Sequence, residues 1–389
     1  MDFTLSGPQE DMQNLVRKIM KSEQVQAWIQ EAKRTKEYPH EFMRHIAPLG
    51  FLGMNIDERY GGMGMTPIDA LIALEQFAYA SISFSLNILV QNSLAGFAIH
   101  EFGTEEQKQT YLPGMVRGEL FGCFANSEPG VGSDAKNITT RAELHNGAYV
   151  INGEKHFCTT ASEAGIAIIF ARTSPRTTGH PGMTAFLIEL KNTKGIEVFK
   201  QPKNAQAGSQ LCRIICDNVS VDENAILGTK DNGWNVCDRT FLHSRIWIGA
   251  QGAGAALRAL DEILNYTVNQ RAAFNKPVFD HQYVSFELAK IYIAIRGARL
   301  LAREAAGQET VDPSHPDFPI MAAGAKYAGT QAAEDAALRY YRFSGGLSIT
   351  EEWNAAQHLL DSLILPIYEG PNEIQLQIIA NHLKRNALR

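Results

Sequence analysis

Cysteine is scarce in this sequence, with five residues in 389, and the number is odd. A disulfide framework usually needs more cysteines, in even number, so the pattern indicates reduced thiols and an intracellular protein. Cys212 and Cys216 stand four residues apart, but no other Cys or His pair has zinc-ligand spacing near them. We therefore expect no metal site and a cytoplasmic location.

An excess of basic residues and long apolar runs are also missing. Lys and Arg number 36 against 42 Asp and Glu, a formal net charge of −6, which argues against a protein that coats nucleic acid or an anionic membrane. Residues 1–13 show no basic segment followed by an apolar one, so no signal peptide is expected. No window approaches the roughly 18–20 apolar residues of a membrane span, which predicts a soluble protein.

The length of 389 residues exceeds one hydrophobic core, because single cores stop growing near roughly 250–300 residues. Residues 1–118 have helical periodicity, and a T-x-x-Q capping box at Thr104 begins a helix that Pro113 is expected to end. Residues 119–232 alternate strand-like runs with turns such as Asn146-Gly147, which favours a small sandwich or barrel. Residues 233–389 are helical again. The order helices, strands, helices predicts an α+β multidomain chain.

Glycine clusters raise the question of nucleotide binding. Gly249, Gly252 and Gly254 lie within a helical stripe and not after a strand, so they favour close helix packing over a dinucleotide site. No G-x-x-x-x-G-K-[ST] motif occurs. The loop at residues 127–134, S-E-P-G-V-G-S-D, offers backbone N–H groups and hydroxyls to phosphate or carbonyl oxygens, although an ordinary polar turn has the same composition.

Glu369 is the candidate for acid–base chemistry. It follows the apolar run at residues 363–368 and precedes Gly370. A carboxylate among apolar neighbours is desolvated, so its pKa rises and it becomes a competent proton acceptor near neutral pH. The alternative that the pattern leaves open is a solvated glutamate in a loop.

Several segments, taken in order, resemble the acyl-CoA dehydrogenase family of flavoenzymes along nearly the whole chain. They are Y-G-G-M-G at 60–64, G-T-E-E-Q-K at 103–108, the loop at 127–134, I-N-G-E-K at 151–155, R-A-A-F-N-K at 271–276, Gln282, Gly345-Gly346, and I-Y-E-G at 367–370. Each is weak alone, but their order and spacing are those of the family. The resemblance implies an N-terminal helical domain (1–118), a middle β-barrel domain (119–232) and a C-terminal four-helix bundle (233–389).

The resemblance also implies non-covalent FAD between the middle and C-terminal domains, completed by a neighbouring subunit. The residues that would hold it from the middle domain are Phe124, Asn126 and Ser127 at the edge of the flavin ring, Ser133 at the pyrophosphate, Phe157 near the isoalloxazine and Thr159 at its N5 and O4. The residues implied from the C-terminal domain are Arg271 and Phe274, which would reach the FAD of the adjacent subunit, with Gln282 and Gly346 nearby and Glu373 by the adenosine half.

For Glu369 the resemblance implies the role of catalytic base. It would take the α proton of an acyl thioester while a hydride passes from the β carbon to flavin N5, which gives a trans-2-enoyl thioester. The residues implied on the substrate side are Ser133, Arg245, Tyr368 and Gly370. The substrate would be bound to CoA or to an acyl carrier protein, the electrons would pass to an electron-transfer flavoprotein, and a shared FAD site implies a homodimer or homotetramer.

The sequence departs from the family pattern at several positions. These are Leu360, where the family has the arginine of an Arg-Asp pair; Ala205-Gln206-Ala207, in place of a glycine-x-arginine segment; Pro371, where threonine is common; Phe157, in place of tryptophan; and Leu242, in place of an acidic residue. The changes leave open a specialised acyl group or one tethered to a carrier protein. A flavin oxidase or monooxygenase is another hypothesis, against which Glu369 argues, and a scaffold that has lost its cofactor is a third.

Overall fold

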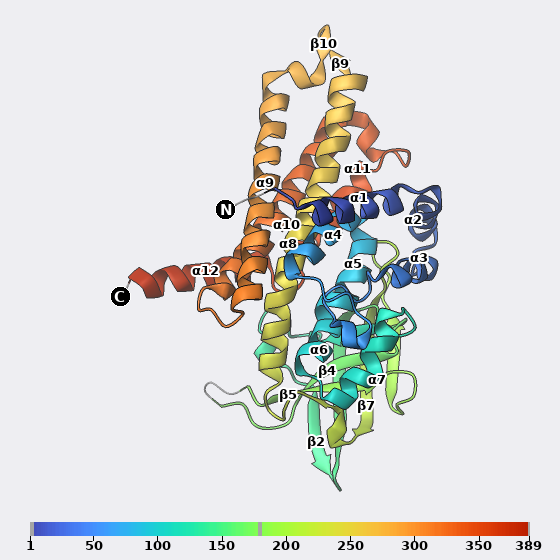
Figure 1. Ribbon diagram of the computed structural model, residues 1–389, viewed down its shortest axis with the longest axis vertical. Coiled ribbons are helices and arrows are strands. Elements are labelled where there is room, and N and C mark those ends of the chain that lie inside the picture. Colours follow the sequence, from blue (N-terminus) through green and yellow to red (C-terminus); the bar gives the residue numbers. More distant parts are fainter. Residues whose placement is uncertain (1–3, 178–180, 388–389) are drawn as a thin grey trace.

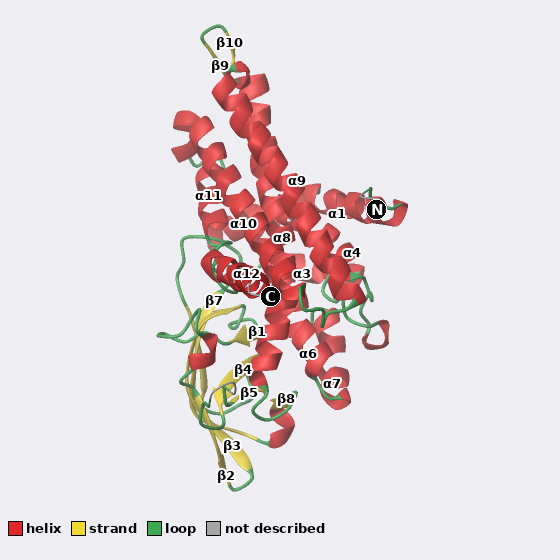
Figure 2. Ribbon diagram, turned by 90° about the vertical axis from the view of Figure 1, so that its left-hand side faces the viewer, coloured by secondary structure: helices red, strands yellow, loops and turns green. Residues whose placement is uncertain are grey.

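The computed structural model describes residues 4–177 and 181–387. Its helices, strands and helices follow in that order along the chain (Figures 1 and 2). The N-terminal helices lie partly against the long C-terminal helices and partly beside the sheet, and the sheet forms one end of the molecule. The predicted α+β order is therefore confirmed.

The first part of the chain is helical. Its helices are α1 (Gly7–Lys21), α2 (Glu23–Thr35), α3 (His40–Ile46), α4 (Pro67–Ala80), α5 (Ile82–Leu89), the π-helical stretch η3 (Val90–Gly96), α6 (Phe97–Phe102) and α7 (Glu105–Val116), with 3-10 turns at Ala47–Leu49 and Glu58–Tyr60. Thr104 caps α7 in a reciprocal capping box, as predicted. The prediction that Pro113 ends this helix is wrong. Proline lacks only the N–H group, and the carbonyl of Pro113 still accepts a bond from Arg117, so the helix continues to Val116.

The expectation that no segment has the composition of a membrane span is also wrong. Within the described residues, Ile82–Phe102 is long and apolar enough, with a mean hydropathy of 1.4 over its most apolar window. However, 94% of that window is buried inside the fold. Polar side chains within the segment find partners there, since Asn92 bonds to the backbone of Met54 and of Phe51. The apolar composition therefore belongs to a central helix of the core.

The middle of the chain forms one sheet. Its strands are β1 (Gly122–Ala125), β2 (Arg141–His145), β3 (Ala148–Thr159), β4 (Ile166–Arg172), β5 (Met183–Glu189), β6 (Ile196–Lys200), β7 (Leu211–Val221) and β8 (Ile226–Leu227), in the order β6-β7-β3-β2-β4-β5-β8, with β1 parallel to β4. The predicted turn at Asn146-Gly147 joins β2 to β3. The sheet folds over a core in which the rings of Tyr149 and Phe186 lie 5.3 Å apart.

Long helices return after residue 232. They are α8 (Gly233–Asn265), α9 (Gln282–Val311), α10 (Phe318–Phe343), α11 (Ala355–Leu363) and α12 (Asn372–Ala387), and a π-helical stretch (Tyr266–Gln270) with a small hairpin, β9 (Ala272–Ala273) and β10 (Lys276–Pro277), joins α8 to α9. The backbones of α8 and α10 touch where both helices carry glycine or alanine residues. A Cβ atom at Gly249 would lie 2.6 Å from the carbonyl oxygen of Ala325, and one at Gly252 would meet the backbone of Gly329. This confirms the packing interpretation of these glycines.

Candidate active site

Glu369 lies in the turn between α11 and α12, and the backbone of this turn is unusual. Glu369 has φ 53° and Gly370 has φ 92°, both in the left-handed region. A residue with a Cβ atom pays for this conformation with about 1–2 kcal/mol, so surrounding contacts must hold it. A Cβ atom at Gly370 would lie 2.9 Å from the amide nitrogen of Gln375.

A buried lysine of α10 holds the turn in this conformation. The ammonium group of Lys326 donates to the carbonyl oxygens of Pro366 and Gly370, both at 2.8 Å, and to Oδ1 of Asn372 at 3.2 Å. Burial lowers the pKa of Lys326 to about 7, although the negative charge of Glu369 opposes the change. Because α10 touches α8 directly, the glycine contacts also fix the position of this lysine.

The carboxylate of Glu369 faces α8. Ser244 donates its hydroxyl hydrogen to Oε2 of Glu369, and Nε of Arg245 lies 3.5 Å from the backbone carbonyl oxygen of Glu369. Burial raises the pKa of Glu369 to about 7, while Ser244, Arg245 and Lys326 limit the rise. The residue is nonetheless partly exposed. The site therefore presents a reachable carboxylate that can take up or release a proton near neutral pH.

Tyr368, the neighbour of Glu369, ties the turn to two further helices. Its hydroxyl donates to Oε1 of Gln251 in α8 at 2.5 Å. The amide of Gln251 donates in turn to Oγ of Ser85 at 2.9 Å and to the carbonyl oxygen of Ile82 at 3.2 Å, both in α5. Polar groups therefore line the side of the turn that faces the N-terminal helices.

The end of β1 approaches α8 close to this turn. The ring of Phe124 lies 5.5 Å from that of Phe241, which precedes Ser244 by one helical turn. Asn126 is buried, and its Oδ1 has no hydrogen-bond partner among the described residues. Ser127 accepts a backbone bond from His156 at 2.8 Å, which places the start of the 127–134 loop beside β3.

The end of β3 contributes an aromatic ring and a hydroxyl group. Phe157 has φ 56° and is 61% exposed, which is unusual for a large apolar side chain in a strand. Thr159 is partly buried at the last position of β3. An unpartnered buried acceptor at Asn126 and an uncovered ring at Phe157 are the features that a flat, hydrogen-bonding cofactor would satisfy. The residues fit FAD in this respect.

A buried ion pair supports the 127–134 loop. Nζ of Lys155 lies 2.8 Å from Oε1 of Glu128, and neither side chain is more than 2% exposed. Burial acts to raise the pKa of Glu128, but Lys155 and the hydroxyl and backbone N–H of Thr139 outweigh it and lower the pKa to about 2. The pair therefore anchors the beginning of the loop at Glu128, whereas Ser133 near its end is exposed.

Four of the predicted cofactor residues lie elsewhere. Arg271 and Phe274 belong to the β9–β10 hairpin at the end of the molecule opposite the sheet (Figures 1 and 2). Phe274 is 91% exposed at its tip. Gln282 begins α9 and Gly346 follows α10, and the rings of their neighbours Tyr283 and Phe343 lie 6.0 Å apart.

We call Arg271, Phe274, Gln282 and Gly346 the distal group, and the β9–β10 hairpin within it lies apart from α12 (Figures 1 and 2). Glu373, in contrast, is exposed in the first turn of α12, four residues from Glu369. The predicted cofactor residues therefore fall into two sets, one on β1, β3, the 127–134 loop and the start of α12, and one at the β9–β10 end of the long helices.

Two lysines lie near a buried carboxylate beside the departures at Leu360 and residues 205–207. Asp361 accepts bonds from the backbone N–H of Gln206 at 2.5 Å and from the amide of Gln357 at 2.7 Å. Burial raises the pKa of Asp361, and these bonds together with the charges of Lys33 and Lys203 oppose the rise. Burial also lowers the pKa of Lys203 to about 8. Lys33 and Lys203 thus supply positive charge near the aspartate.

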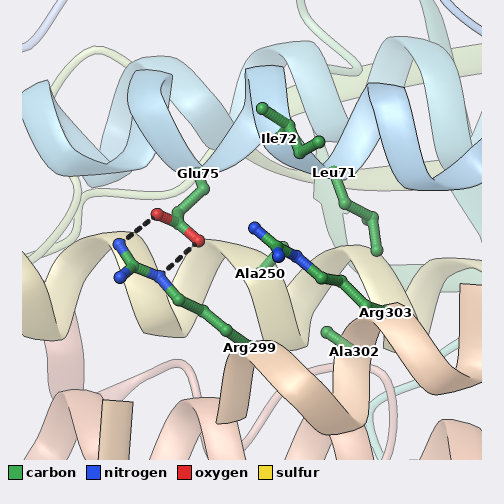
Figure 3. A pocket seen from close by; sticks show the side chains of 7 residues that line it. All are labelled: Leu71, Ile72, Glu75, Ala250, Arg299, Ala302 and Arg303. Carbon is green, nitrogen blue, oxygen red and sulfur yellow. Dashed lines mark hydrogen bonds and ion pairs between the residues drawn. The ribbon is translucent and has the colours of Figure 1, made fainter. Parts of the chain in front are cut away.

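A small cavity between α4, α8 and α9 is a different feature. It has room for about one water molecule, roughly 10 Å³, and Glu75 lies at its edge between Arg299 and Arg303 (Figure 3). Nε of Arg299 donates to Glu75 at 2.9 Å. The contact between Glu75 and Arg299 joins α4 to α9, and the cavity is too small to receive a substrate.

Comparison with known proteins identifies the family. Three family models match: the N-terminal domain of acyl-CoA dehydrogenase at residues 6–119, the middle domain at 123–219 and the C-terminal domain at 231–384. The chain belongs to the acyl-CoA dehydrogenase family. It is accordingly an FAD-binding oxidoreductase that acts on CH–CH groups.

Individual relatives agree with this assignment. The human mitochondrial short-chain specific acyl-CoA dehydrogenase is 35% identical over 350 residues, which cover 90% of this chain and 84% of that protein. The structure of butyryl-CoA dehydrogenase from Megasphaera elsdenii matches with a TM-score of 0.92 and 31% identity, over 98% of this chain and 100% of that one. A structure described as the FAD complex of PigA matches with a TM-score of 0.93 and 27% identity, over 99% of both chains.

Three residues of the site were not singled out from the sequence: Ser244, Gln251 and Lys326. Lys326 had a visible signal, because it is an isolated charge within an alanine-rich helix, where a solvated side chain would be the ordinary interpretation. Ser244 directly precedes Arg245, but only the fold shows that its hydroxyl faces Glu369.

Proposed function

We propose that this protein oxidises a short-chain acyl thioester to the trans-2-enoyl thioester, with Glu369 as the base that removes the α proton. The observation that carries the proposal is the environment of Glu369. Burial raises the pKa of its carboxyl group to about 7, and contacts of Ser244 and Lys326 hold the residue in a strained turn. The names of the human and Megasphaera relatives support a short acyl group.

The chain supplies the proton transfer and the alignment. Oε1 or Oε2 of Glu369 takes the proton of the α carbon, and the backbone N–H of Glu369 donates to the thioester carbonyl oxygen as negative charge develops there. Arg245 and Tyr368 fix the turn against α8, so the carboxylate is aligned before substrate arrives. FAD, when bound, supplies the acceptor for the hydride of the β carbon.

We further propose that Phe124, Asn126, Ser127, Ser133, Phe157 and Thr159 hold the cofactor from the sheet, with Glu373 on the side of α12. The distal group would serve the FAD of a second subunit. Support for self-association comes from α9, whose exposed surface carries four large apolar side chains that are 54–69% exposed: Tyr283, Phe286, Tyr292 and Ile293. Large apolar side chains that are this exposed are common at interfaces, and a homodimer or homotetramer would cover some of them.

The proposed electron acceptor is an electron-transfer flavoprotein, and the proposed location is the cytoplasm. A carrier-bound acyl group is a second candidate substrate. It is favoured by Leu242, which packs against the apolar core where the family often has an acidic residue directed toward CoA.

The test is an anaerobic titration of the FAD-loaded protein. Butyryl-CoA is expected to bleach the oxidised-flavin absorption and to yield crotonyl-CoA, whereas Glu369→Gln is expected to keep its FAD and resist bleaching. Butyryl groups loaded on an acyl carrier protein form the second arm. Faster bleaching in that arm would indicate that the substrate is the carrier-bound acyl group and not acyl-CoA. Equal bleaching of the wild type and the Glu369→Gln variant would overturn the role of Glu369.

A further inference from the structure

Two buried serines form a chain of hydroxyl groups that ends on Glu369. Ser93, in the π-helical stretch η3, lies with its Oγ 3.3 Å from Oγ of Ser244 in α8. Ser244 in turn donates to Oε2 of Glu369. Neither serine has any exposed surface. Three elements distant in sequence, η3, α8 and the turn after α11, thus meet through these groups.

The direction of this chain follows from hydrogen-bond chemistry. An ionised carboxylate can only accept, so Ser244 must give its single hydrogen to Glu369. The lone pairs of Ser244 are then free to accept the hydrogen of Ser93, which otherwise bonds to the carbonyl oxygen of Leu89 at 3.0 Å. When Glu369 is protonated this order is no longer enforced, because the carboxyl group can donate as well. The hydroxyl chain therefore favours the ionised form of the base.

The other charged and titratable groups around Glu369 bond elsewhere. Arg245 reaches the backbone carbonyl of Glu369, Lys326 bonds to the backbone of the turn, and Tyr368 bonds to Gln251. Cys237, also near, is a fully buried thiol whose pKa is raised by burial. Among the described residues, Ser244 makes the one hydrogen bond that the structure shows to the carboxylate oxygens of Glu369.

We propose that Ser244 is a positioning residue that orients the Glu369 carboxylate for proton abstraction, and that Ser93 fixes the hydroxyl of Ser244. The inference rests on the proposed role of Glu369 as base. A π-helical stretch suits this purpose, because its widened turn displaces a side chain relative to a regular helix, and such stretches are frequent at functional sites.

The experiment compares Ser244→Ala, Ser244→Thr and Ser93→Ala with the wild type in two measurements. One is the pH dependence of flavin reduction by butyryl-CoA. The other is an infrared titration of the Glu369 carboxyl group in protein without substrate, identified by its loss in Glu369→Gln. Loss of a hydrogen bond to a charged group is expected to move the acid limb and the carboxyl titration up by about one pH unit in Ser244→Ala.

The variants discriminate a hydroxyl effect from a packing effect. Ser244→Thr keeps the hydroxyl and is expected to titrate as the wild type, and Ser93→Ala is expected to shift both curves in the same direction by a smaller amount. Unshifted curves in Ser244→Ala, or equal shifts in Ser244→Ala and Ser244→Thr, would overturn the proposal. If Ser244→Ala does not fold, unshifted curves in Ser93→Ala overturn it. Flavin reduction that survives in Glu369→Gln would instead refute the proposed function.

Discussion

Replacing Glu369 by glutamine is expected to make the protein more stable above neutral pH, although it removes the proposed base. Burial raises the pKa of this carboxyl group from its ordinary value of 4.5 to about 7. Between these two pH values the folded protein holds a proton that the unfolded chain releases. The stability that Glu369 contributes is therefore complete below pH 4.5 and is lost as the pH rises through about 7.

The size of the effect follows from the two pKa values. At about 1.4 kcal/mol per pH unit, a change from 4.5 to about 7 corresponds to about 3 kcal/mol at pH 8. An unfolding entropy of about 2.1 cal/mol/K per residue gives about 0.8 kcal/mol/K for 389 residues. Glu369→Gln should therefore melt about 4 °C higher than the wild type at pH 8, and the difference should nearly vanish at pH 4.5.

The assay is thermal unfolding of both proteins without substrate, across this pH range and at matched FAD occupancy. Glu351→Gln is the matched control, because Glu351 is an exposed glutamate shortly before α11, and it should leave the melting temperature unchanged at every pH. The reasoning is refuted if Glu369→Gln melts at or below the wild-type temperature at pH 8, since burial of the ionised carboxylate would then not destabilise the folded protein.

Three further predictions concern the same regions. The rate of flavin reduction by saturating butyryl-CoA should fall about tenfold per pH unit below pH 7, because only ionised Glu369 accepts a proton, and a rate independent of pH between 5 and 7 would contradict this. Lys155→Met should lower the free energy of unfolding by about 3–5 kcal/mol in urea denaturation, because it leaves Glu128 buried without its partner. The double variant Lys155→Met with Glu128→Gln should recover part of this loss. Phe274→Ser should change the melting temperature little, since the ring is 91% exposed, yet weaken FAD retention and self-association measured by light scattering; unchanged FAD retention would exclude the hairpin from the cofactor site.

Much of the fold could be predicted from the sequence, because its local signals agree with the tertiary structure. The Asn146-Gly147 turn and the capping box at Thr104 both lie where local chemistry predicts them. The prediction at Pro113 was wrong, because a proline near the end of a helix removes one hydrogen bond and the packed helix can continue past it. The apolar segment Ile82–Phe102 has the composition of a membrane span, and only the packing around it shows that it is a core helix.

The site was less accessible to sequence reasoning. The apolar run before Glu369 predicted a raised pKa, and burial in the fold does raise the pKa of this carboxyl group to about 7. Ser93 and Ser244 gave no signal, and the isolated charge of Lys326 in an alanine-rich helix did not reveal its partner, since each acts on the turn from an element far away in the chain. The loss of arginine at Leu360 could be seen in the sequence, but the lysines that approach Asp361 could be found only in the fold.

The most direct test of the central claim is the rate of anaerobic flavin reduction by butyryl-CoA in Glu369→Gln compared with the wild type, at equal FAD content and saturating substrate. Glu369 as the catalytic base predicts a decrease of about 10²–10⁴-fold with FAD binding unchanged. A rate within about twofold of the wild type would contradict the assignment, because a decrease of that size is far below the contribution of a general base.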